Sequence, residues 1–307
     1  MSVRNRSVSE RNRPADRMSW RTVVIASSAK LDYQMGYLVV RREDTTKIHL
    51  SEISILLIET TAVSLTAALM AELMKKKIKV IFCDEKRNPS SEVIPYYGSH
   101  DTSAKVRRQI EWSSDSKISV WTEIVTDKIR KQEEVLVYFR KSEAELLHEY
   151  LQEIEYGDTS NREGHAAKVY FNALFGKDFS RSAELVTNAM LNYGYSILLS
   201  AFNREISANG YLTQLGLFHN NMFNPFNLAS DLMEPFRVLV DRKVYTMDRQ
   251  VFEHEEKMKL VDILNQEVWI NERKELVNNA IKIYCRSVFD AIEDADVSEI
   301  RFYQYEL

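Results

Sequence analysis

The chain has 307 residues, 45% of them hydrophobic and 28% charged, which is enough for about two domains with a sizeable apolar core. Its formal net charge of −4 argues against a protein that coats nucleic acid by charge alone, although local basic patches are compatible with it. Its apolar runs are far shorter than the roughly 20 residues that cross a bilayer, and Cys83 and Cys285 fit neither a disulfide framework nor a zinc ribbon. We therefore expect a soluble, cytoplasmic protein.

The chain begins with a basic segment. Residues 1–17 carry five arginines against Glu10 and Asp16, and they show no apolar periodicity. We interpret them as a disordered leader, either an upstream start or a remnant of cloning. A basic arm that contacts DNA is the alternative.

Residues 18–98 contain short stretches rich in β-branched residues, which predict a compact β-rich domain. A turn is expected between Asp32 and Gly36. Residues 63–77 have leucines at i, i+4 and i+8 and end in lysines, which predicts a helix. The expected strands, in chain order, are WRTVVIA, GYLVVRR, KIHL, ISILLIE, KVIFCD and VIPYY.

From residue 99 to residue 307 the strand signals nearly vanish and helical periodicity takes over. Helices are expected over residues 102–139, 143–155 and 160–175, and onward to the C terminus. The boundary near residues 97–101 is short, so the two domains should pack closely. The predicted fold class is α+β, with an N-terminal β-rich domain followed by a larger all-α domain.

Glu163 lies where an apolar side chain is expected. The segment SNREGHAAKVYFNALF predicts a helix whose apolar face includes Ala166 and Tyr170, and Glu163 extends that face by one turn. An unpaired buried carboxylate costs several kcal/mol, so it needs a reason. One reason is a capping box, in which Glu163 reaches back to the amide of Ser160. A functional site is the other.

Two further segments carry polar candidates. His219 follows a Gly-containing turn and begins an Asn-rich loop, where its imidazole could bind a metal or simply a neighbour. In NLASDLMEPFR, Asp231 and Glu234 are at i and i+3 and share a helix face, which is also typical of a solvated acidic surface. Pro235 predicts a kink or a first helical turn. Two carboxylates and an imidazole suit Mg²⁺ or Mn²⁺, but spacing alone does not show that they meet.

The blocks NREGHAAKVYFNALFG, NAMLNYGYSILLSAF and FNLASDLMEPFR resemble the CRISPR-associated integrases, the Cas-one family that inserts new spacers into CRISPR arrays. The resemblance runs from about Met18 to Asp241. WRTVV, IHLSEI, VIFCDEKR-P and MEPFR look most like the branch found with type II-A effectors. The resemblance implies the same order of domains, a β-rich one that dimerises followed by a helical catalytic one.

The resemblance also implies a catalytic and metal-binding triad of Glu163, His219 and Glu234. Asp231 resembles a nearby acid and is a secondary candidate. Many relatives have Asp where this chain has Glu234, so the longer side chain puts the metal geometry in doubt. The implied cofactor is Mg²⁺ or Mn²⁺, which would polarise a phosphodiester while a DNA 3′-OH or a water attacks it.

The implied partners follow from the same family. Its members form homodimers, and two dimers flank a dimer of the Cas-two protein in a hetero-hexamer that acts on double-stranded DNA, the spacer precursor and the CRISPR repeat. A type II-A effector nuclease and a ring-forming accessory protein are further possible partners. Two alternatives stay open, a structure-selective metal-dependent nuclease outside spacer acquisition and a non-catalytic helical scaffold.

DNA contacts would come from local basic residues. Arg162 and Lys168 rank highest because they flank Glu163. On the next helix, Asn188, Asn192 and Tyr195 share a face and could support the site or simply pack. The other candidates are Lys75–Lys77, Lys105, Arg107, Arg108, Arg237, Arg242 and Lys243.

Overall fold

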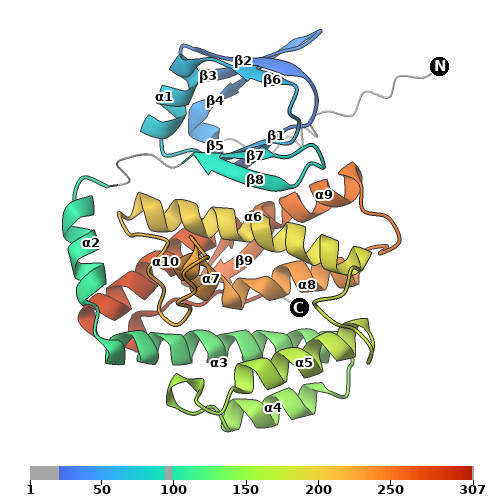
Figure 1. Cartoon of the computed structure of the whole chain (residues 1–307), viewed down its shortest axis with the longest axis vertical. Helices are drawn as coiled ribbons and strands as arrows, with labels where there is room; N and C mark the ends of the chain where they lie inside the picture. The colour runs from blue at the N-terminus through green and yellow to red at the C-terminus, as the bar shows by residue number, and fades with distance from the viewer. Residues whose placement is uncertain (1–20, 94–98, 306–307) are drawn as a thin grey trace.

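The computed structural model describes residues 21–93 and 99–305. The leader, residues 1–17, and all of the predicted strand VIPYY except Val93 lie outside the described residues. The described chain forms a small β-rich part followed by a larger helical part, which confirms the predicted fold class (Figure 1).

Two four-stranded sheets make up the β-rich part, in the orders β1-β5-β7-β8 and β4-β3-β2-β6. In the first sheet β5 pairs in parallel with β1 and β7, and β8 is antiparallel to β7. In the second, β2, β3 and β4 form an antiparallel meander and β6 is parallel to β2. The elements are β1 (Arg21–Ile25), β2 (Ala29–Gln34), β3 (Tyr37–Arg41), β4 (Thr45–His49), η1 (Leu50–Glu52), β5 (Ile53–Ile58), β6 (Val63–Leu65), α1 (Ala67–Lys75), β7 (Lys79–Cys83) and β8 (Pro89–Val93).

The strand β5 is buried along its whole length because both faces of its sheet are covered. Leu56 and Ile58 belong to the core between the two sheets, whereas Ile55 and Leu57 belong to the core of the helical part. A continuous apolar run such as ISILLI suits a strand that is buried on both sides. The β-rich and helical parts therefore share apolar packing, in keeping with the close packing that the sequence predicts.

The structure corrects two details of this part. Residues 29–34 form β2, so the turn predicted from Asp32 lies instead at Met35 and Gly36, whose φ angles are 48° and 90°. Residues 63–65 pair with β2 as β6, so the helix starts only at Ala67, where Thr66 accepts a hydrogen bond from the Leu69 amide. Pairing with a neighbouring strand outweighs helical spacing at these residues.

The helical part is built around α3 (Ser114–Tyr138), which has 25 residues. The sequence predicts one helix over residues 102–139, but the structure breaks it at Trp112, which is buried, and Ser113 caps α3 through the Ser116 amide. The other elements are α2 (Thr102–Glu111), α4 (Ala144–Gln152), η2 (Tyr156–Asp158), α5 (Arg162–Phe175), α6 (Val186–Ala208), α7 (Asn227–Leu232), η3 (Glu234–Phe236), α8 (Arg237–Tyr245), α9 (His254–Val261), η4 (Asp262–Asn265), α10 (Val277–Asp294) and η5 (Val297–Glu299).

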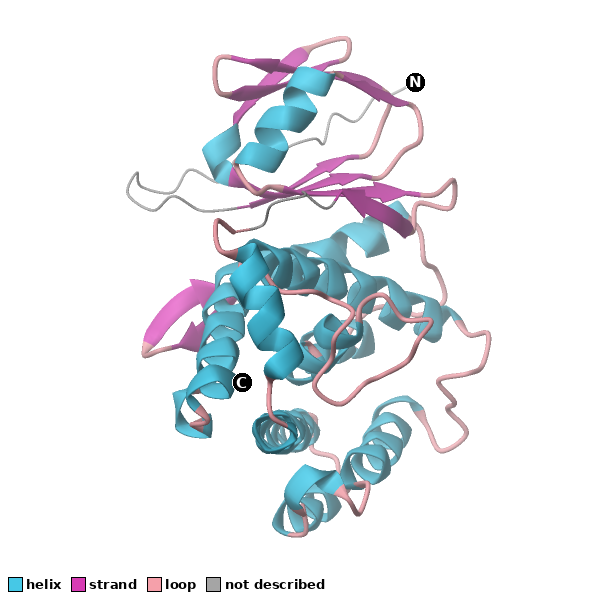
Figure 2. Ribbon diagram, turned by 60° about the vertical axis from the view of Figure 1, so that its left-hand side comes forward, coloured by secondary structure: helices cyan, strands magenta, loops and turns pink. Residues whose placement is uncertain are grey.

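The helical part also contains a β-hairpin, so the prediction of an all-α second domain is wrong in this detail. The antiparallel strands are β9 (Glu267–Ile270) and β10 (Arg273–Leu276), and they lie at the side of the helices (Figure 2). The hairpin turn consists of Asn271 and Glu272, both with positive φ. The sequence signal is weak because the turn lacks the glycine that usually marks such a hairpin.

No helix in residues 21–93 and 99–305 is long and apolar enough to cross a membrane.

A candidate metal and phosphodiester site

Glu163 lies in the first turn of α5, and its carboxylate contacts Lys128 of α3. The amides of Arg162 and Glu163 donate to the carboxylate of Asp158, at 2.7 and 3.0 Å, so Asp158 caps the helix. Of the two explanations for Glu163, the capping box is therefore wrong. Ser160 Oγ has no hydrogen-bond partner among the described residues, and Glu163 instead forms an ion pair with Lys128.

Lys128 was not among the candidates from the sequence. It lies on α3 with a side chain that is only 7% exposed, and its ammonium group contacts the carboxylates of both Glu163 and Glu234. These two carboxylates hold the pKa of Lys128 above its usual range even though burial acts to lower it. The spacing of the sequence could have identified Lys128, because it follows Trp121 and Ile124 on the apolar face of α3.

Glu234 opens the short helix η3, where Pro235 ends the run of α7, as the sequence predicts for this proline. Its Oε1 accepts a hydrogen bond from Arg237 Nε at 2.9 Å, and its Oε2 lies 2.5 Å from Lys128 Nζ. Burial acts to raise the pKa of Glu234, but Arg237 and Lys128 outweigh it and lower that pKa to about 2. Glu234 is therefore a carboxylate at all ordinary pH values.

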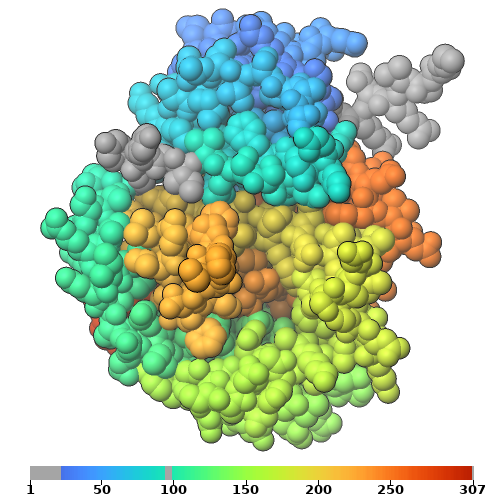
Figure 3. All heavy atoms as spheres, viewed as in Figure 1, coloured from blue at the N-terminus to red at the C-terminus, as the bar shows by residue number. Residues whose placement is uncertain are grey.

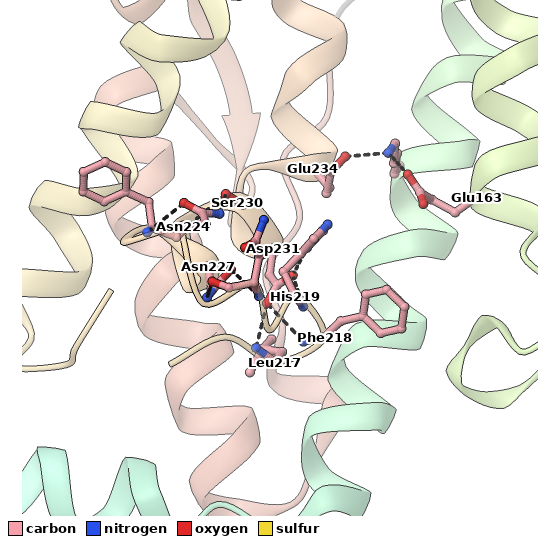
Figure 4. A network of polar contacts seen from close by, with 12 residues as sticks. Glu163, Leu217, Phe218, His219, Asn224, Asn227, Ser230, Asp231 and Glu234 are labelled. Atoms are coloured by element: carbon pink, nitrogen blue, oxygen red, sulfur yellow. Dashed lines mark hydrogen bonds and ion pairs between the residues drawn. The ribbon is translucent and has the colours of Figure 1, made fainter. Parts of the chain in front are cut away.

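Asp231 does not point toward Glu234, although the two residues are one turn apart. Its carboxylate is fully buried and accepts hydrogen bonds from the amides of Leu217, Phe218 and His219, at 2.6, 3.1 and 3.1 Å. It also contacts His219 Nδ1 at 2.5 Å. Asp231 thus ties the end of α7 to the loop that carries His219 (Figure 4).

The loop around His219 is fixed from two further directions. The Phe218 ring stacks on Trp121 of α3, with ring centroids 4.5 Å apart and planes 3° apart. At Gly216, an added Cβ would lie 2.7 Å from the Asp231 carboxylate, so a larger residue cannot fit without displacing it. The hydrogen bond to Asp231 raises the pKa of His219. Because Nδ1 binds Asp231, Nε2 is the ring nitrogen left for a ligand.

The residues present fit a divalent cation, although they do not yet surround one. Among the described residues there is no group of three His, Cys, Asp or Glu side chains close enough to hold a metal. Yet Glu163 and Glu234 already converge on a cation, the ammonium of Lys128. Glu234 Oε2 is buried and lies against the ammonium of Lys128, so its surroundings already suit a positive charge. The half-exposed His219 ring lies beside them (Figure 4).

Comparison with known proteins decides the family. The family described as CRISPR associated protein Cas1 matches residues 22–272, which is most of the chain. The chain belongs to the Cas1 family. The Cas1 endonuclease of Neisseria meningitidis serogroup C is 35% identical over 235 residues, covering 76% of this chain and 77% of that protein. A Cas1 endonuclease of Francisella tularensis subsp. novicida is 26% identical over 277 residues, covering 82% and 87%.

Solved structures share the fold. A Cas1 protein from Thermotoga maritima has a TM-score of 0.72 at 18% identity, covering 89% of this chain and 97% of its own. A casposase bound to an integration product has a TM-score of 0.71 at 18% identity, covering 91% of both chains. A chain of a Cas6-RT-Cas1–Cas2 complex has a TM-score of 0.71 at 19% identity, and the match covers 95% of this chain but 37% of that longer one. The type II-A branch stays a prediction.

The basic candidates on this Cas1 fold differ in how free their charges are. Arg237 belongs to the site, since it pairs with Glu234. Arg162 pairs with Glu153 at 2.9 Å, and Arg108 pairs with Glu293 at 3.0 Å, so their charges are partly offset. Three other candidates are engaged through their ammonium groups, Lys75 with Glu72, Lys105 with Glu293 and Lys77 with the carbonyl of Ala208. Arg242 contacts the rings of Tyr138 and Tyr305. The remaining candidates are Lys76, Arg107 and Lys168, which are exposed, and Lys243, which is partly buried.

The predicted face of Asn188, Asn192 and Tyr195 exists on α6 and turns toward the site. Both asparagines bind Arg181, which the sequence did not single out. Tyr195 is buried and donates a hydrogen bond to Asp241. Arg237, the partner of Glu234, lies 4.7 Å from the centroid of the Tyr195 ring. Tyr195 therefore connects α6 to Arg237 and so to Glu234, whereas the two asparagines position Arg181.

Proposed function

We propose that this chain is the integrase of CRISPR spacer acquisition, a metal-dependent DNA nuclease and transesterase that joins spacer 3′-OH ends to the CRISPR repeat. The observation that carries the proposal is the convergence of Glu163 and Glu234, from separate helices, on one cation beside His219. Membership of the Cas1 family supports the reaction class. The relatives from Neisseria and Francisella are both described as endonucleases.

Glu163, Glu234 and Nε2 of His219 are the groups that would hold Mg²⁺ or Mn²⁺. Such an ion, when bound, polarises a phosphodiester and lowers the pKa of a hydroxyl beside it. Asp231 keeps His219 in the tautomer that exposes Nε2, because it binds the Nδ1 side of the ring. Two carboxylates and one imidazole leave room for water and phosphate oxygens.

The remaining charges of the site match a phosphodiester reaction. Arg237 pairs with Oε1 of Glu234 while Lys128 contacts Oε2, and the Arg237 side chain is partly exposed next to that carboxylate. As the phosphodiester is attacked, negative charge grows on its oxygens, and nearby fixed cations stabilise that charge. The space-filling view shows a hollow between the helices α5 and α6 and the loop with His219, where a DNA strand could lie (Figure 3).

The proposed partners follow from the family and from the assemblies of its solved relatives. One solved relative is part of a Cas6-RT-Cas1–Cas2 complex, and another is a casposase bound to an integration product. We therefore propose that two homodimers of this chain flank a Cas2 dimer in a hetero-hexamer that binds double-stranded DNA. An effector nuclease and a ring-forming accessory protein would join only if the type II-A assignment holds.

The test is an integration assay. Purified chain and its Cas2 partner are incubated with a spacer-like duplex that has free 3′ ends and a plasmid with a leader and a repeat, in Mg²⁺ or Mn²⁺. The expected product is a covalent joint between the duplex 3′ end and the repeat. Cleavage of branched DNA without joining would favour a structure-selective nuclease, and no DNA processing would favour a scaffold.

The site assignment has its own test. Glu163→Ala and His219→Ala should each abolish strand transfer while the dimer and DNA binding persist. Integration by either variant would refute the assignment. In the scaffold alternative, by contrast, Glu163→Ala would change only stability.

A further inference from the structure

Arg181 lies in the connection between α5 and α6, and two amide side chains fix its orientation. Its Nη1 donates to Asn188 Oδ1 at 2.5 Å, and its Nη2 donates to Asn192 Oδ1 at 2.7 Å. Asn188 is buried and donates to the backbone carbonyls of Ser180 and Ala183, both at 2.8 Å. The guanidinium is therefore held by acceptors that are themselves fixed.

The acid that interacts with the charge of Arg181, the buried Asp241, does so at longer range than an ion pair. In the described part of the chain no carboxylate lies within ion-pair distance of its guanidinium. An arginine that is oriented by neutral acceptors keeps its full positive charge and its free N–H donors. The helix dipole does not explain this position, because the N-terminal end of α6 favours an anion rather than a cation.

A second arginine lies on the same aromatic ring. Arg181 is 5.4 Å and Arg237 is 4.7 Å from the centroid of Tyr195, whose hydroxyl donates to Asp241 and so fixes the ring. Arg237 is paired with Glu234 at 2.9 Å, whereas Arg181 forms no ion pair with any described residue. Two guanidinium groups near one ring repel each other. The buried Asp241 interacts with both of them, and a further anion beside their exposed parts would be attracted by both charges.

We propose that Arg181, with Arg237, forms a phosphate-binding subsite that holds a phosphodiester of the DNA strand next to the one that reacts. The inference rests on the proposed function, since Glu234 links the subsite to the reacting position. The planar fork of an arginine suits two oxygens of one phosphate. Tyr195 is buried and offers no exposed ring on which a base could stack, so the subsite binds the DNA backbone and reads no base.

The subsite is tested by DNA binding without metal, so that catalysis does not enter the measurement. Fluorescence anisotropy in EDTA, with a spacer-like duplex at several salt concentrations, should show that Arg181→Gln binds about tenfold more weakly than wild type. The slope of log K against log salt should fall by about 0.9, the value for one phosphate contact on duplex DNA. Arg301→Gln is the matched control, because Arg301 is exposed and its guanidinium donates, among the described residues, only to Ser298 O.

Replacing single phosphates of the DNA by uncharged analogues identifies the phosphate that Arg181 contacts. Methylphosphonates are placed one at a time along the duplex, and at one position the wild type should lose affinity while Arg181→Gln loses no more. Asn192→Ala keeps the charge but removes one orienting acceptor, so it should give a smaller loss at that same position. Thermal unfolding shows that each variant is folded, and Asn192→Ala keeps the test valid if Arg181→Gln does not fold.

If Arg181→Gln has the DNA affinity and salt slope of wild type, the subsite is overturned. The same holds if Arg301→Gln loses as much DNA affinity as Arg181→Gln, or if the loss of affinity cannot be assigned to one phosphate. The integration assay is read separately. If no joining occurs but one phosphate depends on Arg181, the subsite stands and the proposed function fails. If joining occurs with an Arg181→Gln variant that binds like wild type, the function stands and the subsite fails.

Discussion

Replacing Lys128 by methionine tests whether the two carboxylates form an ion-binding site. Methionine keeps most of the length of the side chain but removes the ammonium that contacts Glu163 and Glu234. Glu234 is 6% exposed and Glu163 is 29% exposed, so the variant leaves one buried and one partly exposed carboxylate facing each other. Without metal, the variant should therefore be less stable than wild type.

The size of the effect follows from the burial. Removing one partner of a buried ion pair costs about 3–5 kcal/mol, and the lower end applies here because Arg237 still pairs with Glu234. A loss of about 3 kcal/mol corresponds to a fall of about 5 °C in Tm for a chain of this size. A bound ion at a hundred times its Kd adds back about 2.7 kcal/mol. In wild type the gain should be smaller, since the ion competes with the ammonium.

Thermal unfolding in EDTA and across a Mn²⁺ titration measures both quantities. Lys128→Met should begin lower than wild type and rise further with Mn²⁺. Lys168→Met is the control, because Lys168 is exposed on α5, and it should behave like wild type in both conditions. An equal or smaller Mn²⁺ shift in Lys128→Met than in wild type would refute the reasoning.

Two further predictions concern the supports of the site. Gly216→Ala would place a Cβ 2.7 Å from the Asp231 carboxylate, so we expect the stability to fall by about 1–3 kcal/mol. Calorimetry should also show that the variant binds Mn²⁺ more weakly than wild type. Mn²⁺ binding equal to that of wild type would contradict the role of this turn. Burial raises the pKa of Asp241 to about 7, from about 3.9 in an unfolded chain. Between about pH 4 and pH 7 the Asp241 carboxyl is therefore protonated in the folded chain but ionised in the unfolded chain. The free energy of unfolding should fall by up to about 4 kcal/mol as the pH rises across this range. Asp241→Asn cannot ionise and should remove this fall in chemical denaturation, whereas parallel pH curves for the two proteins would show that burial does not penalise the charge.

Local patterns determined most of the secondary structure. The apolar run of β5 and the helical spacing of α5 each depend on neighbours in the chain, so both could be read from the sequence. The strands β2 and β6 and the hairpin β9–β10 were missed because their strand character comes from pairing with another segment. Their own residues carry only weak β signals.

The sequence by itself determined which polar residues lie where an apolar side chain is expected, above all Glu163 on the apolar face of α5. The resemblance of three sequence blocks to the family then joined Glu163, His219 and Glu234 into one predicted site. Only the tertiary structure decided their roles relative to each other. It separated Asp231 from Glu234, since Asp231 binds the loop of His219. It also brought Lys128 between the two glutamates, because a buried charge finds its partner in space and leaves no mark at the partner's position in the sequence.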